Sequence, residues 1–179
     1  MGQRNRPVVL VRNAIMKGFT LIELIIYIGI VTAILLVAFN FGWEIIYGNV
    51  KSQAIREVQQ NTRFAIEKMS ESILNASSTD SPTPGNSANF LSLKMQDPNL
   101  DPTLFEVVDG KLKITQGGNG PYELTNDRVI VTNLQFSNLS YENTPGTIRV
   151  QITIEHVNPN NLSQYEVSLD TEDTISLRK

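Results

Sequence analysis

One carboxylate stands where the sequence is otherwise apolar. Glu23 lies inside the segment KGFTLIELIIYIGIVTAILLVAF, which runs from Lys17 to Phe39 and has the composition of a membrane-spanning helix. A charged side chain at the centre of such a helix costs about 2.5–3.5 kcal/mol even on the most lenient scale. A carboxylate kept there needs a partner, and the chemistry that it offers is ion pairing in a low-dielectric setting.

A group of aspartate and asparagine side chains has the spacing of a calcium loop. Asp97, Asn99 and Asp101 alternate as the first ligands of such a loop do. The sixth position is Pro102 where the loop needs glycine, and the twelfth is Val108 where it needs glutamate. We therefore interpret the segment as an Asp/Asn/Pro turn, with a calcium site as the alternative.

Other reactive groups are sparse. His156 is the single histidine, and a metal site or a nucleophile–base pair needs more partners than it offers, so we expect it at the surface. Asn75, Asn138 and Asn161 each begin an Asn-x-Ser triplet and are also expected at the surface. No catalytic constellation or cofactor motif emerges, and the chain is not expected to be an enzyme.

The elements that position Glu23 follow from an uneven composition. Residues 24–43 are 20 consecutive residues without a charge, enough for a helix to cross a hydrocarbon core. Residues 1–18 contain four basic side chains and no acidic one, which predicts a cytoplasmic N-terminus and an extracytoplasmic C-terminal region. With no cysteine in the chain, disulfides and thiol chemistry are excluded.

The order of these features differs from that of an ordinary secretory signal, because the basic region ends at Gly18 and the apolar run follows it. The segment KGFTLIEL, with its hydrophobic continuation, resembles the class III signal of type IV pilins and type II secretion pseudopilins. The resemblance implies that a prepilin peptidase cleaves between Gly18 and Phe19 and methylates Phe19. Many major pilins have a proline near residues 40–42, where this chain has none, and this favours a minor pilin or a pseudopilin.

The resemblance also offers a partner for Glu23, the acidic fifth residue of the mature chain. Cleavage creates a positive α-amine on Phe19, and in the family the glutamate of one subunit is thought to meet the terminal amine of its neighbour. Residues 19 and 23 are one helical turn apart, so pairing within one chain is also open. A third interpretation places Glu23, about 6 Å inside the helix, at the level of the lipid headgroups.

Apolar residues recur at steps of three and four from Ile46 to Ala76, which predicts an amphipathic helix that continues the apolar one. Alternation with period two follows, in segments 103–108, 111–116, 128–136, 147–155, 164–169 and 174–178. The predicted fold is α+β: a long N-terminal helix packed on a C-terminal antiparallel β-sheet, like a pilin. The expected parts are a leader (1–18), an assembly helix (19–43), an amphipathic helix (44–77), a linker loop (78–89) and a sheet domain (90–179).

The segment RFAIEKMSESILNAS and the closing TISLRK are most similar to J-type pseudopilins and W-type minor pilins. The expected function is that of a structural subunit of a type IV pilus or secretion pseudopilus. The expected partners are the prepilin peptidase, other pilin or pseudopilin subunits, the inner-membrane assembly platform and, before assembly, membrane lipid. The alternatives are a pilus-borne adhesin or DNA-uptake receptor and a plain signal-anchored extracytoplasmic domain.

Charge bears on the nucleic-acid alternative. Loss of residues 1–18 would remove four of the 15 basic side chains and none of the 18 acidic ones, leaving a net charge of −7. An acidic body has no general attraction for a phosphate backbone, although a local basic patch is compatible with that sum.

Overall fold

The computed structural model describes residues 18–141 and 146–178. Residues 1–17, with the basic side chains of the predicted leader, lie outside that description. The chain divides between Glu44 and Ile45 into two compact units, and one helix, α1 (Leu21–Asn75), contributes residues to both.

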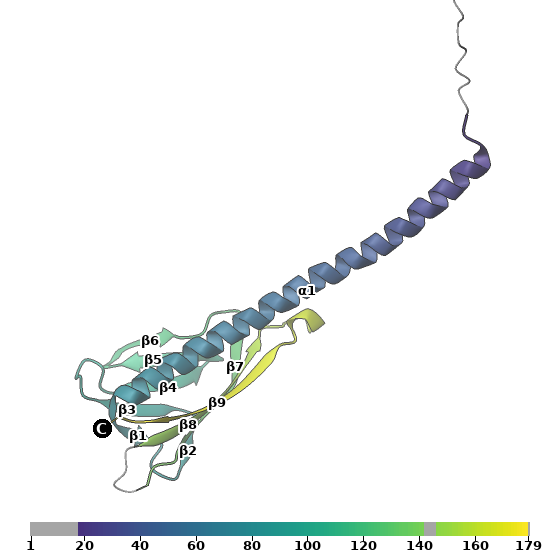
Figure 1. Cartoon of the computed structure of the whole chain (residues 1–179). Coiled ribbons are helices and arrows are strands. Elements are labelled where there is room, and N and C mark those ends of the chain that lie inside the picture. Colours follow the sequence, from purple (N-terminus) through teal and green to yellow (C-terminus); the bar gives the residue numbers. More distant parts are fainter. Residues whose placement is uncertain (1–17, 142–145, 179) are drawn as a thin grey trace, which may run out of the picture. The chain divides into compact units, whose positions relative to one another are not determined.

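The predicted α+β fold class is confirmed. One long N-terminal helix packs on antiparallel β-structure, and the C-terminal part of α1 lies against the strands in Figure 1. The described strands form two sheets rather than the one expected, in the orders β1-β3-β4-β5-β6 and β2-β7-β8-β9. The first sheet contains β1 (Ala76–Ser81), β3 (Leu91–Met95), β4 (Thr103–Val108), β5 (Lys111–Gln116) and β6 (Asn119–Glu123). The second contains β2 (Ser87–Ala88), β7 (Val129–Asn138), β8 (Thr147–His156) and β9 (Ser168–Ser176).

The helix and both sheets share one hydrophobic core. Val58, Ala65, Met69 and Ile73 form the buried stripe of α1, at the steps of four and seven that its period predicts. The sequence did not decide whether Phe64 or Ala65 belongs to the apolar stripe. In the structure Ala65 is buried and Phe64 is 43% exposed. The fully buried side chains from the sheets include Leu91, Leu93, Phe105, Leu112, Phe136, Ile148, Val150, Ile152 and Ile154.

The hairpin between β4 and β5 forms as predicted. Val108 pairs with Lys111, and the two residues between them both have positive φ, 55° at Asp109 and 73° at Gly110. Two consecutive left-handed residues define the type I′ turn, whose twist matches that of the flanking strands. The Asp-Gly dipeptide therefore determines the register of this hairpin.

The expected linker loop at 78–89 is wrong in part, because it contains most of β1 and all of β2. β1 has the sequence ASSTDS, without an apolar alternation that would mark a strand. It is ordered by pairing with β3, and Ser77 Oγ donates to the carbonyl of Lys94 at 2.8 Å. Tertiary pairing outweighs local preference here.

The C-terminal strands also differ from the expectation. Segments 164–169 and 174–178 were predicted as two strands, whereas β9 is a single strand of nine residues and Ser163–Tyr165 is a short 3-10 helix. The register of β9 against β8 is unbroken from Ser168 to Ser176, so the long partner strand holds the intervening polar residues in extended conformation.

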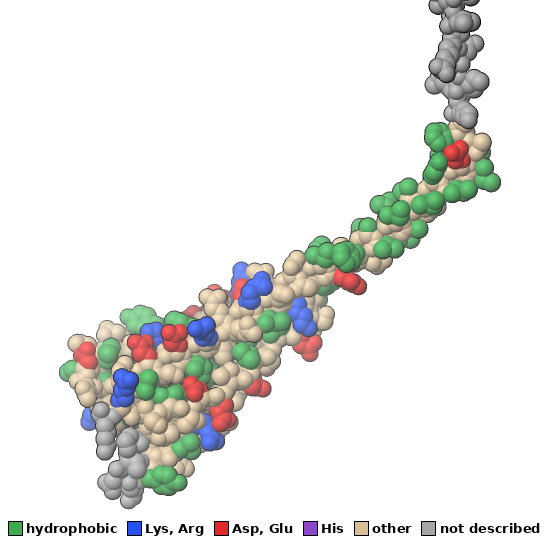
Figure 2. Space-filling view, in the orientation of Figure 1, with side chains coloured by type: hydrophobic (Ala, Val, Ile, Leu, Met, Phe, Trp, Pro, Cys, Tyr) green, Lys and Arg blue, Asp and Glu red, His purple; other side chains and the backbone are tan. Residues whose placement is uncertain are grey.

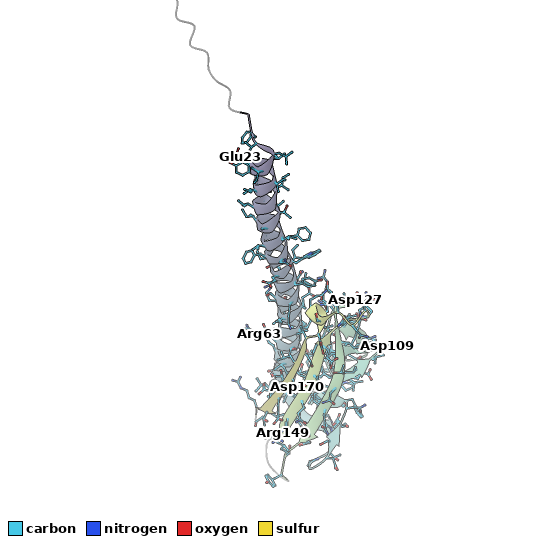
Figure 3. The ribbon with its side chains drawn as sticks, turned by 90° about the vertical axis from the view of Figure 1, so that its right-hand side faces the viewer. Glu23, Arg63, Asp109, Asp127, Arg149 and Asp170 are labelled. Carbon is cyan, nitrogen blue, oxygen red and sulfur yellow. The ribbon has the colours of Figure 1, made fainter. Side chains whose placement is uncertain are left out.

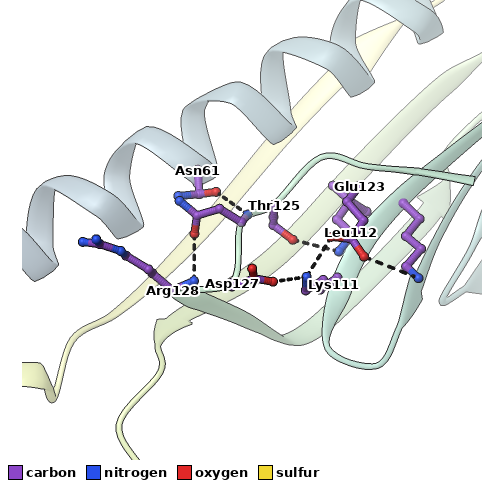
Figure 4. Close-up of polar contacts among 9 residues, drawn as sticks. Asn61, Lys111, Leu112, Glu123, Thr125, Asp127 and Arg128 are labelled. Carbon is purple, nitrogen blue, oxygen red and sulfur yellow. Dashed lines mark hydrogen bonds and ion pairs between the residues drawn. The ribbon is translucent and has the colours of Figure 1, made fainter.

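A polar clamp ties the loop at 124–128 to α1 and β5 (Figure 4). Asn61 Oδ1 accepts a hydrogen bond from the Asn126 N–H at 3.0 Å, and the Thr125 hydroxyl accepts one from the Leu112 N–H at 3.1 Å. Arg128 reaches back to the helix, with Nη1 2.6 Å from Glu57 Oε1. The clamp fixes the path of the chain from the first sheet into the second.

Lys111 forms the charged part of this clamp. Its ammonium group contacts the carboxylate of Asp127 and lies 2.7 Å from Glu123 Oε2. The hydrogen bond to Asp127 is the main cause that raises the pKa of Lys111, followed by that to Glu123, and the same bond lowers the pKa of Asp127.

Candidate functional site

The predicted assembly residue lies at the beginning of α1, in a small cluster of side chains. Figure 3 labels Glu23 in the first turns of the helix. The N–H of Glu23 donates to Thr20 Oγ1 at 3.3 Å, which makes Thr20 the N-cap of the helix. Tyr27 donates from its hydroxyl to Glu23 Oε1 at 3.1 Å. The ring of Tyr27 also meets the ring of Phe19 edge to face, with 6.1 Å between centroids.

Glu23 has electrostatic support from its position as well. It is the acidic residue of the first helical turn, where the unpaired N–H groups and the helix dipole favour negative charge. Of the residues that the structure describes, only Tyr27 contacts its carboxylate through a hydrogen bond. That bond reduces the cost of holding a carboxylate in apolar surroundings.

The N-terminal part of α1, which presents this cluster, is apolar on every side. Figure 2 shows hydrophobic side chains along the N-terminal part of α1, whereas Lys, Arg, Asp and Glu gather on the second unit. One stretch of α1 is long and apolar enough to cross a membrane. None of that stretch is buried within the chain, and Ile34, Val37 and Phe39 are 62%, 72% and 69% exposed. The surface lacks a partner among the described residues.

The predicted processing residues precede the helix. Gly18 and Phe19 lie outside α1, no other group comes within 4 Å of a Cβ built on Gly18, and Phe19 is 75% exposed. The two residues on either side of the proposed scissile bond are thus sterically open in this structure. Gly18, Phe19 and Glu23 fall within one continuous segment, with Thr20 and Tyr27 among them.

Thr20 and Tyr27 were not identified from the sequence. The signal for Thr20 was present, because Thr-x-x-Glu before an apolar run is the pattern of a capping box. Only half of that box forms, since the Glu23 side chain turns to Tyr27 instead of returning to the Thr20 N–H. The spacing of four between Glu23 and Tyr27 was also a usable signal for a helical pair.

The turn at residues 97–101, the alternative calcium site, is held by hydrogen bonds to its own aspartate side chains. Asp97 Oδ1 accepts from the N–H of Asn99 at 2.9 Å and from its Nδ2 at 3.0 Å, and Asp101 Oδ1 accepts from the N–H of Met95 at 2.8 Å. The bond from the Asn99 N–H to Asp97 is that of an Asx turn, in line with the main interpretation of the segment as a turn. In the described ranges, no group of three or more His, Asp and Glu side chains is arranged to hold a metal ion.

His156 and Asn138 have structural contacts. The His156 ring stacks on Tyr165, with centroids 5.1 Å apart, and its Nδ1 lies 2.9 Å from the carbonyl oxygen of Val157. Asn138 was expected at the surface, but it is only 2% exposed. Its Nδ2 donates to the Pro82 carbonyl at 2.7 Å and its Oδ1 accepts from the Ser140 N–H, so this amide joins two loops instead of facing solvent.

Comparison of the chain with protein-family models, with curated proteins and with solved structures finds no match. The functional conclusion therefore depends on the geometry of the N-terminal cluster and on the residues that form it.

Proposed function

We propose that this chain is a minor pilin or pseudopilin, a structural subunit of a type IV pilus or secretion pseudopilus. The observation that carries the proposal is the beginning of α1. A carboxylate, Glu23, occupies the first turn of α1, and the apolar stretch of that helix is not buried within the described chain. A glycine–phenylalanine junction, sterically open, lies directly before that helix.

In this proposal α1 anchors the unassembled subunit in the inner membrane, with its N-terminus in the cytoplasm. A prepilin peptidase hydrolyses the Gly18–Phe19 bond, so that water supplies one oxygen of the new Gly18 carboxylate and a proton of the new Phe19 amine. The peptidase then transfers a methyl group to that amine from a methyl donor, and the amine stays cationic. The membrane helix remains attached to the product because the cut precedes it.

Assembly then exchanges lipid for protein around the apolar helix. Helices from neighbouring subunits cover the exposed side chains of residues 21–43, and the assembly platform supplies subunits to the growing fibre. The Glu23 carboxylate of one subunit forms an ion pair with the Phe19 amine of its neighbour, because a buried pair of opposite charges costs far less than either charge alone. The same pairing sets the axial register of the helices, and no step needs a catalytic residue or a cofactor in this chain.

Processing is tested on the protein recovered from native membranes, by intact mass and N-terminal sequencing. The proposal expects an N-methylated Phe19 terminus. An intact terminus upstream of Gly18, in cells whose prepilin peptidase is active, would contradict the proposal and leave a signal-anchored domain.

Assembly is tested with Glu23→Ala, which should insert and be cleaved normally yet be absent from purified fibres. The matched control is Glu44→Ala, which removes the first carboxylate after the apolar stretch and should assemble as the unaltered chain does. Equal incorporation of both variants would exclude the ion-pairing mechanism even if processing is confirmed.

A further inference from the structure

Strand β9 forms one edge of the second sheet. Among the described strands it pairs with β8 alone, and its outer side has no neighbour. The N–H of His156 donates to the Val167 carbonyl and the N–H of Leu177 to the Gly146 carbonyl. Antiparallel pairs alternate between bonded and non-bonded, so this register directs the odd-numbered backbone groups of β9 toward β8. The even-numbered groups, from Ser168 to Ser176, face outward.

One outward N–H group of this edge, in its C-terminal half, already has an acceptor within the chain. Asp173 Oδ1 accepts the outward N–H of Thr174 at 2.8 Å, which occupies that donor. The described residues provide no such acceptor for the outward N–H groups of Ser168, Asp170 or Glu172. The open stretch is Ser168–Glu172, and its register against β8 contains no bulge.

A groove of about 520 Å³ lies beside the same stretch, between β9 and α1. Its apolar part is formed by Leu169 of β9 and Ile66 of α1, and Arg63 and Glu67 of α1 also line it. Figure 3 labels Arg63 on the helix and Asp170 on β9. Side chains alternate across a sheet, so a strand added to β9 would direct every second side chain into this groove.

The other face of the open stretch is acidic. Asp170 and Glu172 are exposed there, on the face opposite the groove. Glu172 Oε1 lies 3.2 Å from Arg149 Nε, whereas Asp170 accepts a hydrogen bond only from the neutral hydroxyl of Thr153, at 2.6 Å. One carboxylate therefore stays without a cationic neighbour among the described residues, beside the position that an added strand would occupy.

We propose that Ser168–Glu172 is a docking site for an extended segment of a partner protein, which binds by adding a strand to the β9 edge. Backbone hydrogen bonds from the outward groups of β9 supply the affinity, as in other cases of strand addition. The segment alternates apolar residues, which enter the groove beside Leu169, with lysine or arginine residues, which face Asp170. Charged edge strands often serve only to prevent pairing, and that protective role is the competing outcome of the test.

The test uses the full chain in lipid nanodiscs and a displayed library of random seven-residue peptides. Selected peptides should alternate apolar and basic residues, and their binding should slow hydrogen exchange at the amides of Asp170 and Glu172. Failure to select a peptide that protects these two amides would overturn the proposal in favour of a protective edge.

Variants of the edge provide the second arm. Glu172→Pro removes the outward N–H of residue 172, which makes no hydrogen bond to β8. The variant should weaken peptide binding by about tenfold or more. Glu172→Gln separates the effect of charge from that of the donor. Thr174→Pro, the matched control, alters an outward position whose donor Asp173 already occupies, and should change the affinity less than about twofold. Equal losses for the two proline variants, with unchanged circular dichroism, would also overturn the proposal.

Discussion

The hydroxyl of Tyr27 donates a hydrogen bond to Glu23 Oε1 across 3.1 Å and one turn of the helix. This bond turns the carboxylate toward the C-terminal direction of α1, because side chains four residues apart are neighbours on a helix. A carboxylate held in this direction does not complete the capping box with Thr20. The ring of Tyr27 also contacts Phe19, so Tyr27 holds Phe19 and Glu23 in one cluster at the beginning of the helix.

Tyr27→Phe isolates this hydrogen bond, because phenylalanine keeps the ring that contacts Phe19 and loses only the hydroxyl. We expect the carboxylate stretching band of Glu23, identified by its loss in Glu23→Gln, to shift in the infrared spectrum of the chain in nanodiscs. Tyr47→Phe, on the same helix but distant from Glu23, should leave the band in place. An unchanged band in Tyr27→Phe would show that the bond is absent in lipid.

Gly110→Ala tests the hairpin turn. Its φ of 73° is strained for any residue with a Cβ, by about 1–2 kcal/mol, and a Cβ there would lie 2.6 Å from Ile130 Cγ1. Gly85→Ala is the matched control, because Gly85 has a φ of 78° but open space around it. We expect Gly110→Ala to lower the free energy of unfolding more than Gly85→Ala does, as measured by denaturation in detergent and circular dichroism. Equal losses would mean that Ile130 moves aside without cost.

The sequence predicted those parts of the fold whose local signals agree with their surroundings. The period of α1, the Asp109-Gly110 turn and the alternation of β8 each suffice to define an element, and each is present as predicted. β1 and the middle of β9 lack such patterns, and their conformation comes from the strands beside them. Pairing partners distant in sequence are not visible in a local period, so these two segments were misassigned.

The candidate site was predicted through Glu23 but not through its neighbours. An acidic residue in an apolar run is conspicuous in any sequence, whereas Thr20 and Tyr27 are ordinary residues until the helix places them beside Glu23. The docking edge of β9 had no sequence signal at all. It depends on which strand is last in the sheet and on which outward N–H group Asp173 occupies.

The ion pair of Lys111 and Asp127 predicts a defined dependence of stability on pH. Asp127 has its pKa lowered from 3.8, so its contribution is present above that value and is lost as the pH falls through the lower pKa of the folded state. Lys111 has its pKa raised from 10.5, so its contribution is present below that value and is lost as the pH rises through the higher pKa of the folded state. Between these limits the pair contributes a constant amount.

A double-mutant cycle with Lys111→Met and Asp127→Asn measures this contribution. We expect a favourable coupling at pH 7 that decreases on acidification below about pH 4 and in high salt, since exposed pairs are screened. The pair Lys68 and Glu71, 2.8 Å apart on the surface of α1, is the control for an ion pair outside the clamp. A coupling at pH 7 that is unaffected by salt would assign the effect to packing instead of charge.

Asn61→Ala tests whether the clamp holds the helix to the sheets. Asn61 is 9% exposed, and its Oδ1 is the acceptor for the N–H of Asn126. Removing it takes the protein partner from that donor, and because Asn126 itself is exposed, the free energy of unfolding should fall by about 0.5–1.5 kcal/mol. The amide of Asn126 should also exchange its hydrogen faster, since local opening then costs less.

Gln60→Ala is the matched control for Asn61→Ala, because Gln60 is the preceding residue on α1 and points to solvent. It should change the free energy of unfolding by less than about 0.5 kcal/mol and leave the exchange of Asn126 unaltered. If Asn61→Ala instead lowered stability while the exchange of Asn126 stayed slow, the loss would come from the helix itself. The bond of Asn61 Nδ2 to the Glu57 carbonyl, at 2.8 Å, would then be the one that matters. Faster exchange of the Asn126 amide in Asn61→Ala, but not in Gln60→Ala, would assign the stabilisation to the contact between helix and loop.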